Sequence, residues 1–409
     1  MIHELFVSAD LSASCWPAAG RPRQDAPCRL TGRSGPVRGL GGLSVCAPAP
    51  RADFRHIADT GLPRHNARDL RRLLASEQAG LVLVILALGT ILTALAGSHV
   101  DRLTGAEVNN FLNSYTLIQT ATDASFFAVM AVGATIVIIA GGIDLSVGSI
   151  YALAGVATAL TLRAMGPMPG WQTFAIGLGI SLAVGLICGG LNGFMVVGLR
   201  VHPFIITLGT MWILRGVAFV ASHAESILLP DVLTRVAKAP LGLAASLYPV
   251  PMLTMILVTV AGAVYLTQTV MGRHVFAIGG NPEASRFSGL RLWRIQIGVF
   301  VISGLTAGLA AFMGASFYGS ASCVDATGYE LYVIASAVVG GASLAGGKGS
   351  AVNATLGAIL IVLIRQSIRT LHFDQNYEWI IIGCATIIAV VLDRTSASFT
   401  ARRLARAAK

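Results

Sequence analysis

Residues 124–149 read ASFFAVMAVGATIVIIAGGIDLSVGS, an apolar run that ends in two glycines, one acid and two serines. Asp144 is the only charged residue between Asp123 and Arg163. An uncharged apolar run of about 20 residues is long enough to cross a bilayer as a helix. The stretch therefore predicts membrane helices on both sides of a short polar interruption.

The whole chain has the same apolar character. Of its 409 residues, 55% are hydrophobic and 12% are charged, and the mean hydropathy is +0.73. Soluble domains contain about 25% charged residues, so a soluble fold is excluded. The composition predicts an all-α polytopic membrane protein with about ten transmembrane helices, at residues 78–100, 124–143, 145–162, 172–198, 203–221, 239–272, 295–324, 331–346, 351–371 and 378–392.

The distribution of basic residues predicts the orientation of these helices. With ten crossings both termini lie on one side, and 22 of the 29 Lys and Arg residues fall on that side, against 4 in the opposite loops. Half of the 22 lie in residues 1–78. By the positive-inside rule, we expect both termini in the cytoplasm. The net charge of +10 then follows from topology and requires no nucleic-acid partner.

The chain divides into three predicted parts. Residues 1–78 are rich in Arg, Pro, Gly and Ala without apolar periodicity, which predicts a disordered basic N-terminal extension. This extension is either without function or a regulatory or targeting arm. Residues 79–393 form the predicted transmembrane domain, and residues 394–409 form a predicted cytoplasmic C-terminal tail. The six cysteines have no metal-ligand spacing, so neither a metal site nor a disulfide framework is expected.

Small residues cluster within several predicted helices. The segments AIGLGISLAVGLICGGLNG and SGLTAGLAAFMGAS contain many of the 46 glycines and allow helices to approach closely in a membrane. The segment VGGASLAGGKGS at 339–350 departs from a phosphate-binding loop at two motif positions, so it is interpreted as a glycine-rich cytoplasmic turn. Its likeness to GGIDLSVGS suggests an internal duplication.

The predicted cytoplasmic loop at 271–292 contains the signals of a short helix. Asn281 can cap a helix, Pro282 suits the first helical position, and Glu283 favours the positive end of the helix dipole. Ser288 and Gly289 then end the turn. The loop predicts an amphipathic helix that either docks a soluble protein or lies on the membrane without a partner.

Three long motifs now appear in one order along the chain. GGIDLSVGS followed by ALAGVATA, GGNPEASRFSG, and TGYELYVIASAVVGGASLAGGKGS resemble the permease subunit of ribose-type ABC importers for monosaccharides, in the branched-chain amino acid/ribose permease superfamily. The resemblance extends from about residue 79 to the end. It implies an ABC type II importer-like bundle in the bacterial inner membrane, surrounded by lipid and paired with a second copy or a paralogue as a dimer.

The same resemblance implies how such a chain works. Separate ABC ATPase subunits hydrolyse ATP on the cytoplasmic side, and a periplasmic sugar-binding protein delivers the sugar. The chain itself is then no enzyme and binds no cofactor or metal. The implied contacts to the ATPase come from the loop already described, at Gly280, Asn281, Glu283, Ala284, Ser285, Arg286, Ser288 and Gly289.

The resemblance also gives the polar interruption a role. A helix break at Gly141 and Gly142 frees backbone groups that must face protein or a water-filled path. Asp144, with Ser146 helping, either caps the next helix or contacts the passing sugar. Other residues at motif positions brace helices or touch substrate, namely Gly148, Asn192, Tyr329 and Glu330.

Charged residues near the predicted outer surface raise further alternatives. Glu330 is expected at an outer helix entrance, where solvation is easy. Arg365 and Arg369 lie one turn apart, where the family pattern leads us to expect small amides. They either extend toward the outer surface or bind a hydroxyl-rich sugar, an acidic sugar or the binding protein.

Two other classes of membrane protein fit the sequence less well. An ion-coupled secondary transporter of a small polar solute remains an alternative, although such proteins need several intramembrane acids or histidines and this chain offers Asp144 and Glu330. A membrane enzyme is disfavoured because the sequence has no HExxH, no GxSxG and no Cys/His cluster. The sequence leaves open which sugar is carried and whether the dimer is homo- or heterodimeric.

Overall fold

The computed structural model describes residues 77–100, 105–239 and 249–374, together with six positions between 377 and 387. The predicted N-terminal extension up to residue 76, the predicted C-terminal tail and most of the predicted crossing 378–392 lie outside these residues. Nine of the ten predicted crossings can therefore be compared with helices of the structure.

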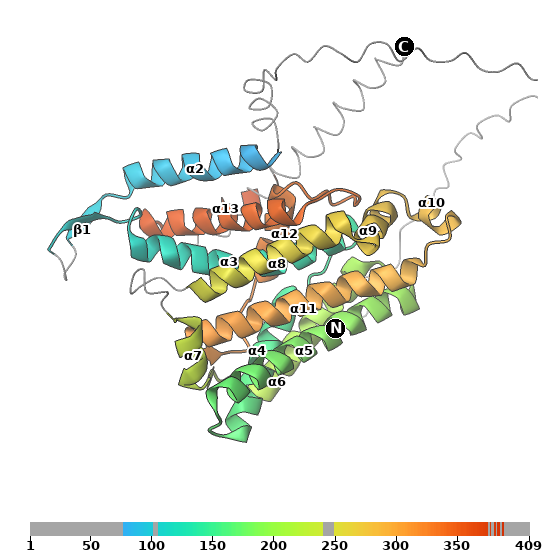
Figure 1. Cartoon of the computed structure of the whole chain (residues 1–409), viewed down its shortest axis with the longest axis horizontal. Coiled ribbons are helices and arrows are strands. Elements are labelled where there is room, and N and C mark those ends of the chain that lie inside the picture. The colour runs from blue at the N-terminus through green and yellow to red at the C-terminus, as the bar shows by residue number, and fades with distance from the viewer. Residues whose placement is uncertain are drawn as a thin grey trace, which may run out of the picture. The chain divides into compact units, whose positions relative to one another are not determined.

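Within the described part, eight helices are long and apolar enough to cross a membrane, and most run nearly parallel to one another in Figure 1. They are α2 (Glu77–Leu95), α3 (Ser114–Ile139), α4 (Val147–Met165), α5 (Gly170–Leu199), α6 (Pro203–Ser222), α8 (Pro249–Gln268), α11 (Leu292–Tyr318) and α13 (Ala351–Thr370). The predicted all-α polytopic architecture is confirmed.

Shorter elements connect these helices. The short helices are α7 (Asp231–Ala237), α9 (Val270–Gly280), α10 (Pro282–Phe287) and α12 (Tyr329–Val339). Two small antiparallel ribbons pair β1 (Ser98–Val100) with β2 (Glu107–Asn109), and β3 (Ile227–Leu228) with β4 (Ser320–Ala321). In the second ribbon Ile227 lies opposite Ala321, so the loop after α6 is joined to the loop after α11.

α12 differs from the full crossing predicted at 331–346. Its 11 residues reach roughly 16 Å at 1.5 Å per residue, about half of a ~30 Å hydrocarbon core. The helix ends where Gly341 adopts a φ of 87°, a left-handed conformation that glycine accepts readily. The predicted full span is thus replaced by a helix that is too short to cross the hydrocarbon core on its own.

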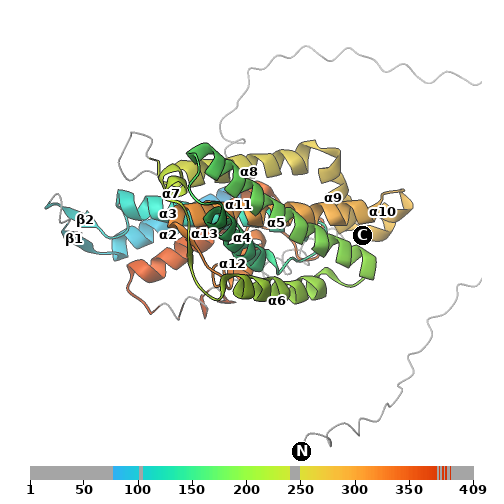
Figure 2. The ribbon, with the colours of Figure 1, turned by 90° about the horizontal axis from the view of Figure 1, so that it is seen from below.

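α3 begins earlier than predicted and is the most enclosed helix of the bundle. Asn113 caps it, because its Oδ1 accepts the N–H of Thr116 at 2.8 Å. Asp123 therefore lies inside the helix instead of bounding it. The most apolar window of α3 is 94% buried, against 6% for α2. Figure 2 shows α6 and α8 along opposite sides of the bundle.

The small residues of α5 and α11 let their backbones touch, as the sequence predicts. A Cβ added to Gly189 would lie 3.1 Å from the Cα of Gly304, and the hydroxyl of Ser181 donates to the carbonyl of Gly308 at 2.6 Å. Such close approach replaces the hydrophobic driving force that lipid cannot supply between helices. The connection between α3 and α4 lies against this pair of helices.

Candidate functional site

The predicted helix break between α3 and α4 is present. Gly141 has a φ of 83°, and its N–H donates to the carbonyl of Ile138 at 2.9 Å. The N–H of Gly142 donates to the carbonyl of Val137 at 3.0 Å. These bonds satisfy carbonyls that a helix end would otherwise leave free. The chain then runs through residues 143–146 before α4 begins.

Asp144 holds a buried group of side chains, here called the Asp144 cluster, consisting of Asp144, Ser146, Asn192 and Ser303. One carboxylate oxygen accepts the N–H and the hydroxyl of Ser146, at 3.0 and 2.6 Å. The other accepts the hydroxyl of Ser303 on α11 at 2.8 Å. Asn192 on α5 donates to the Ser146 hydroxyl at 2.7 Å. Asp144 is 1% exposed, so the cluster joins three elements inside the bundle.

This geometry corrects one detail of the predicted cap. The N-cap of α4 is Ser146, whose own side chain makes no capping bond. Asp144 stands two residues earlier and binds the N–H of Ser146, which is the pattern of an Asx turn. Thr207 on α6 adds a bond from its hydroxyl to the carbonyl of Ile143 at 3.0 Å. The break is thus held on three sides by α5, α6 and α11.

Gly148 and Glu330 meet where α4 and α12 begin. A Cβ on Gly148 would lie 2.6 Å from the carbonyl oxygen of Ala326 and would also collide with the carboxylate of Glu330. Glu330 is only partly exposed, and its Oε2 is buried without a hydrogen-bond partner in the described structure. One carboxylate oxygen of Glu330 is therefore enclosed by protein, although the residue as a whole is only partly buried.

Arg215 on α6 is a residue to which the sequence assigned no role. Its guanidinium donates to three carbonyls of the loop between β4 and α12: those of Cys323 at 2.8 Å, Asp325 at 2.6 Å and Ala326 at 3.3 Å. A cation within an otherwise apolar helix was the available signal, because such residues normally have a partner inside the protein. Arg215 fixes the loop that precedes α12.

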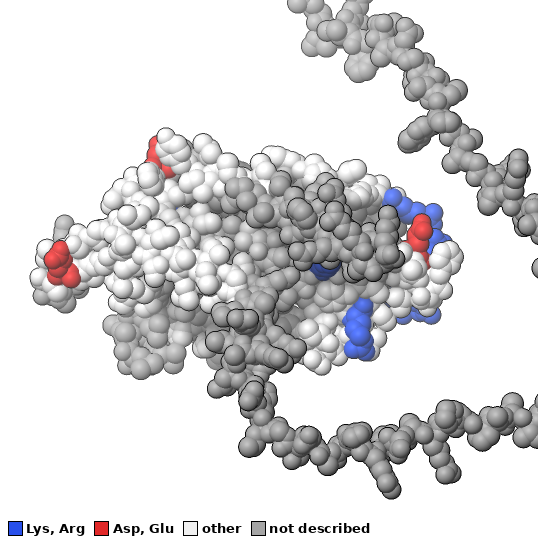
Figure 3. Space-filling view, turned by 90° about the horizontal axis from the view of Figure 1, so that it is seen from above, with Lys and Arg blue, Asp and Glu red and all other residues white. Residues whose placement is uncertain are grey.

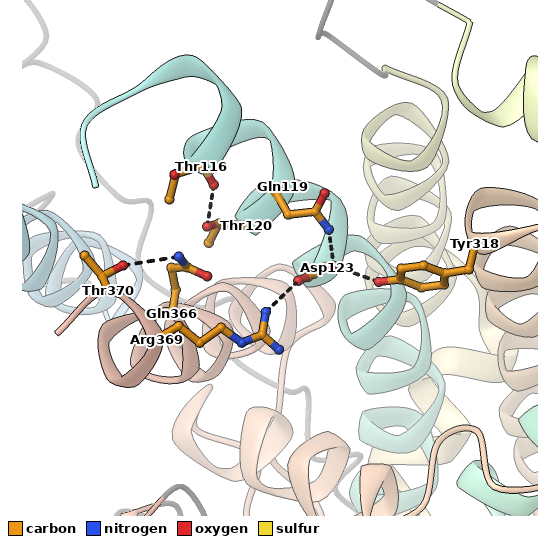
Figure 4. A network of polar contacts seen from close by, with 8 residues as sticks. All are labelled: Thr116, Gln119, Thr120, Asp123, Tyr318, Gln366, Arg369 and Thr370. Carbon is orange, nitrogen blue, oxygen red and sulfur yellow. Dashed lines mark hydrogen bonds and ion pairs between the residues drawn. The ribbon is translucent and has the colours of Figure 1, made fainter. Parts of the chain in front are cut away.

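A second polar group, here called the Asp123 network, consists of Gln119, Asp123, Tyr318 and Arg369. Figure 4 shows Asp123 of α3 between Tyr318 of α11 and Arg369 of α13. Its Oδ1 accepts from Gln119 at 3.0 Å and from the Tyr318 hydroxyl at 2.9 Å. Its Oδ2 lies 3.6 Å from a guanidinium nitrogen of Arg369. Sequence reasoning missed Asp123 because it treated this acid as the boundary of an apolar run.

Aromatic rings adjoin the Asp123 network. The guanidinium of Arg365 lies 5.3 Å from the ring centroid of Phe127 and 5.0 Å from that of Tyr332. The rings of Phe127 and Tyr329 are 4.4 Å apart. Arg365 is thus partly buried against aromatic faces, a favourable position for a cation, and does not simply extend to the outer surface.

The eight residues predicted to contact an ATPase lie together at the other end of the bundle. Asn281 ends α9 and caps α10, since its Oδ1 accepts the N–H of Ala284 at 2.9 Å. The hydroxyl of Ser288 returns to the carbonyl of Ala284 at 2.9 Å, and Gly289 leaves the helix with a φ of 82°. The predicted capping is confirmed. Phe287 on the same helix is 90% exposed and was not singled out from the sequence.

A backbone junction joins α9 to the helix break. The N–H of Gly347 donates to the carbonyl of Ile139, the last residue of α3, at 2.9 Å. A Cβ on Gly279 would lie 2.6 Å from the Gly347 nitrogen, and one on Gly346 would lie 3.1 Å from the Cα of Gly141. The end of α9, the end of α3 and the glycine-rich turn after α12 therefore touch without side chains between them.

The turn after α12 repeats the turn after α3. Gly341 has a φ of 87° and donates to Val338 at 2.8 Å, while Ala342 donates to Ala337 at 2.9 Å. These are the same two bond types that close α3. The repeated geometry agrees with the internal duplication suggested by the two sequence motifs.

Comparison with known proteins gives this arrangement a context. Residues 116–390 match the family model described as "Branched-chain amino acid transport system / permease component". The D-allose transport system permease protein AlsC of Escherichia coli K12 is 34% identical over 286 residues, covering 69% of this chain and 85% of that protein. The ribose import permease protein RbsC of the same strain is 35% identical, covering 69% and 87%. The fructose import permease protein FrcC of Rhizobium meliloti is 29% identical, covering 86% and 98%.

Proposed function

The chain belongs to the family of branched-chain amino acid transport system permease components, and from that premise we propose that it is the permease subunit of an ABC importer for a monosaccharide. The observation that carries the proposal is the match along 85% and 87% of the lengths of two permeases named for D-allose and ribose. The protein is a multi-pass membrane protein. The proposed transmembrane permease domain is residues 79–393.

The proposed orientation places both termini and α10 on the cytoplasmic side of the bacterial inner membrane. Figure 3 shows blue basic side chains at the end of the bundle that carries α9 and α10. Residues 269–294, which include both helices, contain four arginines and the acid Glu283. An excess of Lys and Arg in short loops is the usual mark of the cytoplasmic side.

The partners in this proposal are ABC ATPase subunits, a periplasmic sugar-binding protein and a second permease, either a copy or a paralogue. α10 is suited to meet the ATPase, because it carries Glu283 and Arg286 beside the exposed Phe287. An exposed aromatic ring flanked by charges is a common centre of a protein contact. The backbone junction at Gly279 would then carry a displacement of α10 to the end of α3.

In the proposed mechanism ATP hydrolysis by the partner subunits displaces α10 and alternately opens the bundle to each side. In this proposal the chain catalyses no reaction and binds no cofactor, because the partner subunit binds the ATP. In the described residues no group of three or more His, Cys, Asp or Glu side chains is placed to hold a metal ion. Affinity for sugar would reside mainly in the binding protein.

Reconstitution in vesicles tests the proposal. The permease with its ATPase and loaded binding protein should accumulate sugar when ATP is supplied, and the permease alone should accumulate nothing. Uphill uptake by the permease alone under an ion gradient would overturn the proposal in favour of a secondary transporter. Thermal-shift screening of the cognate binding protein against pentoses, hexoses and polyols identifies the sugar to use.

A further inference from the structure

The charged residues of the Asp123 network lie within transmembrane helices, where charged side chains are rare. Asp123 is three turns into α3, and Arg365 and Arg369 are in the last two turns of α13, a helix otherwise free of charged residues. Almost all charged side chains within such helices face the protein interior or water. The network therefore borders either a wet path or another subunit.

The network is accessible, unlike the Asp144 cluster. The side chains of Arg369 and Asp123 are 43% and 15% exposed, and Tyr318 is 56% exposed. Asp144, Ser146 and Asn192 are each exposed by 1% or less. The first group is thus open at the surface of this chain, and the second is enclosed by it. The Asp144 cluster is thus suited to bracing helices, and the Asp123 network to contact.

The chemistry of the network matches a hydroxylated ring. A carboxylate, a guanidinium, an amide and a phenol together accept and donate hydrogen bonds in several directions. The Arg369 nitrogen and the Asp123 oxygen are 3.6 Å apart, longer than a good hydrogen bond, so a sugar hydroxyl can take both groups as partners with a small shift. The rings of Tyr318 and Tyr329 add apolar faces for the C–H side of the sugar.

The charges favour a neutral ligand. Arg369 is opposed by Asp123, and Arg365 lies against the rings of Phe127 and Tyr332. An anionic sugar would meet the carboxylate of Asp123 at close range, whereas a hydroxyl gains a charge-assisted bond from it. We propose that the Asp123 network is a contact site for a neutral monosaccharide in the half of the bundle opposite α10. This rests on the proposed function.

The test uses the whole transporter, with ATPase and binding protein, reconstituted and supplied with radiolabelled D-ribose, D-allose or D-fructose. We expect Asp123→Asn and Tyr318→Phe each to lower the kcat/KM of uptake at least tenfold for the best sugar. They should also change the ratio of kcat/KM between D-ribose and D-allose. ATPase stimulation by the loaded binding protein should stay within twofold. Arg163→Gln, an exposed charge at the end of α4, is the matched control and should leave uptake unchanged.

Several results would overturn this inference. Unchanged uptake and an unchanged sugar ratio in Asp123→Asn and Tyr318→Phe mean that the sugar does not touch the network. Loss of the permease dimer with the sugar ratio intact assigns the network to the subunit interface. Tyr318→Phe removes a single hydroxyl and decides the matter if Asp123→Asn fails to assemble. If the unmutated transporter moves no sugar at all, the proposed function fails first, and the two failures are thereby distinguished.

Discussion

Replacing Gly279 by alanine should separate the three segments that meet at the backbone junction. The new Cβ would lie 2.6 Å from the nitrogen of Gly347 and 2.9 Å from the carbonyl carbon of Ile139. These are backbone atoms, so relief requires α9 to move away from α3. The movement would also stretch the hydrogen bond from Gly347 to Ile139, which is 2.9 Å long.

The size of the effect follows from two contributions. Overpacking a well-packed position costs about 1–3 kcal/mol, and losing a hydrogen bond adds about 1 kcal/mol. Alanine is the better helix former and recovers up to about 1 kcal/mol. Gly280→Ala makes the same change in helix propensity one residue later, where a Cβ meets nothing within 4 Å. The difference between the two variants is therefore about 2–4 kcal/mol, free of the propensity contribution.

Denaturant unfolding of the purified protein in detergent, followed by circular dichroism, measures this difference. We expect Gly279→Ala to unfold at lower denaturant concentration than the unmutated protein, and Gly280→Ala to unfold at the same or a higher concentration. Equal unfolding free energies for the two variants, within about 0.5 kcal/mol, would refute the assignment of Gly279 to a tight backbone contact.

Three further predictions concern other parts of the bundle. Asp144→Ala should lower the unfolding free energy by about 3 kcal/mol because three donors lose their acceptor. Asp144→Asn keeps one acceptor oxygen, so it should lose less stability and retain near-normal uptake. Equal losses of unfolding free energy in the two variants would contradict a bracing role. Changing Glu283 and Arg286 together to alanine should abolish ATP-driven uptake without loss of the folded permease, and full uptake would disprove ATPase docking at α10. Gly189→Ala should lower the unfolding free energy by about 2 kcal/mol, because its Cβ would collide with the carbonyl oxygen of Phe300, and Gly190→Ala should change it little, because its Cβ would meet only Val301 at 3.9 Å; similar unfolding curves would refute the α5–α11 contact.

Helix ends that depend on residues close in sequence were the features that the sequence predicted correctly. Asn281, Pro282 and Gly289 act through bonds to residues within a few positions, so the start and end of α10 could be predicted. The break at Gly141 is local for the same reason. The predicted length of α12 was wrong because apolar composition does not distinguish a full crossing from a short helix followed by a turn.

Contacts between distant segments could not be predicted. Asp123 was taken as a boundary because a carboxylate usually ends an apolar run, but here Tyr318 and Arg369 from two other helices stabilise it inside α3. The role of Arg215 likewise depends on hydrogen bonds to carbonyls of a loop more than 100 residues later in the chain. A single sequence does not show which helices are neighbours, and the roles of these residues depend on that information.

The three hydrogen bonds from Arg215 to one loop limit how α6 and α12 can move relative to each other. With carbonyls of Cys323, Asp325 and Ala326 fastened to one guanidinium, α6 cannot slide along its axis without drawing the start of α12 with it. We therefore expect those two helices to move together if the bundle rocks. Relative movement of helices is then expected at connections that Arg215 does not hold.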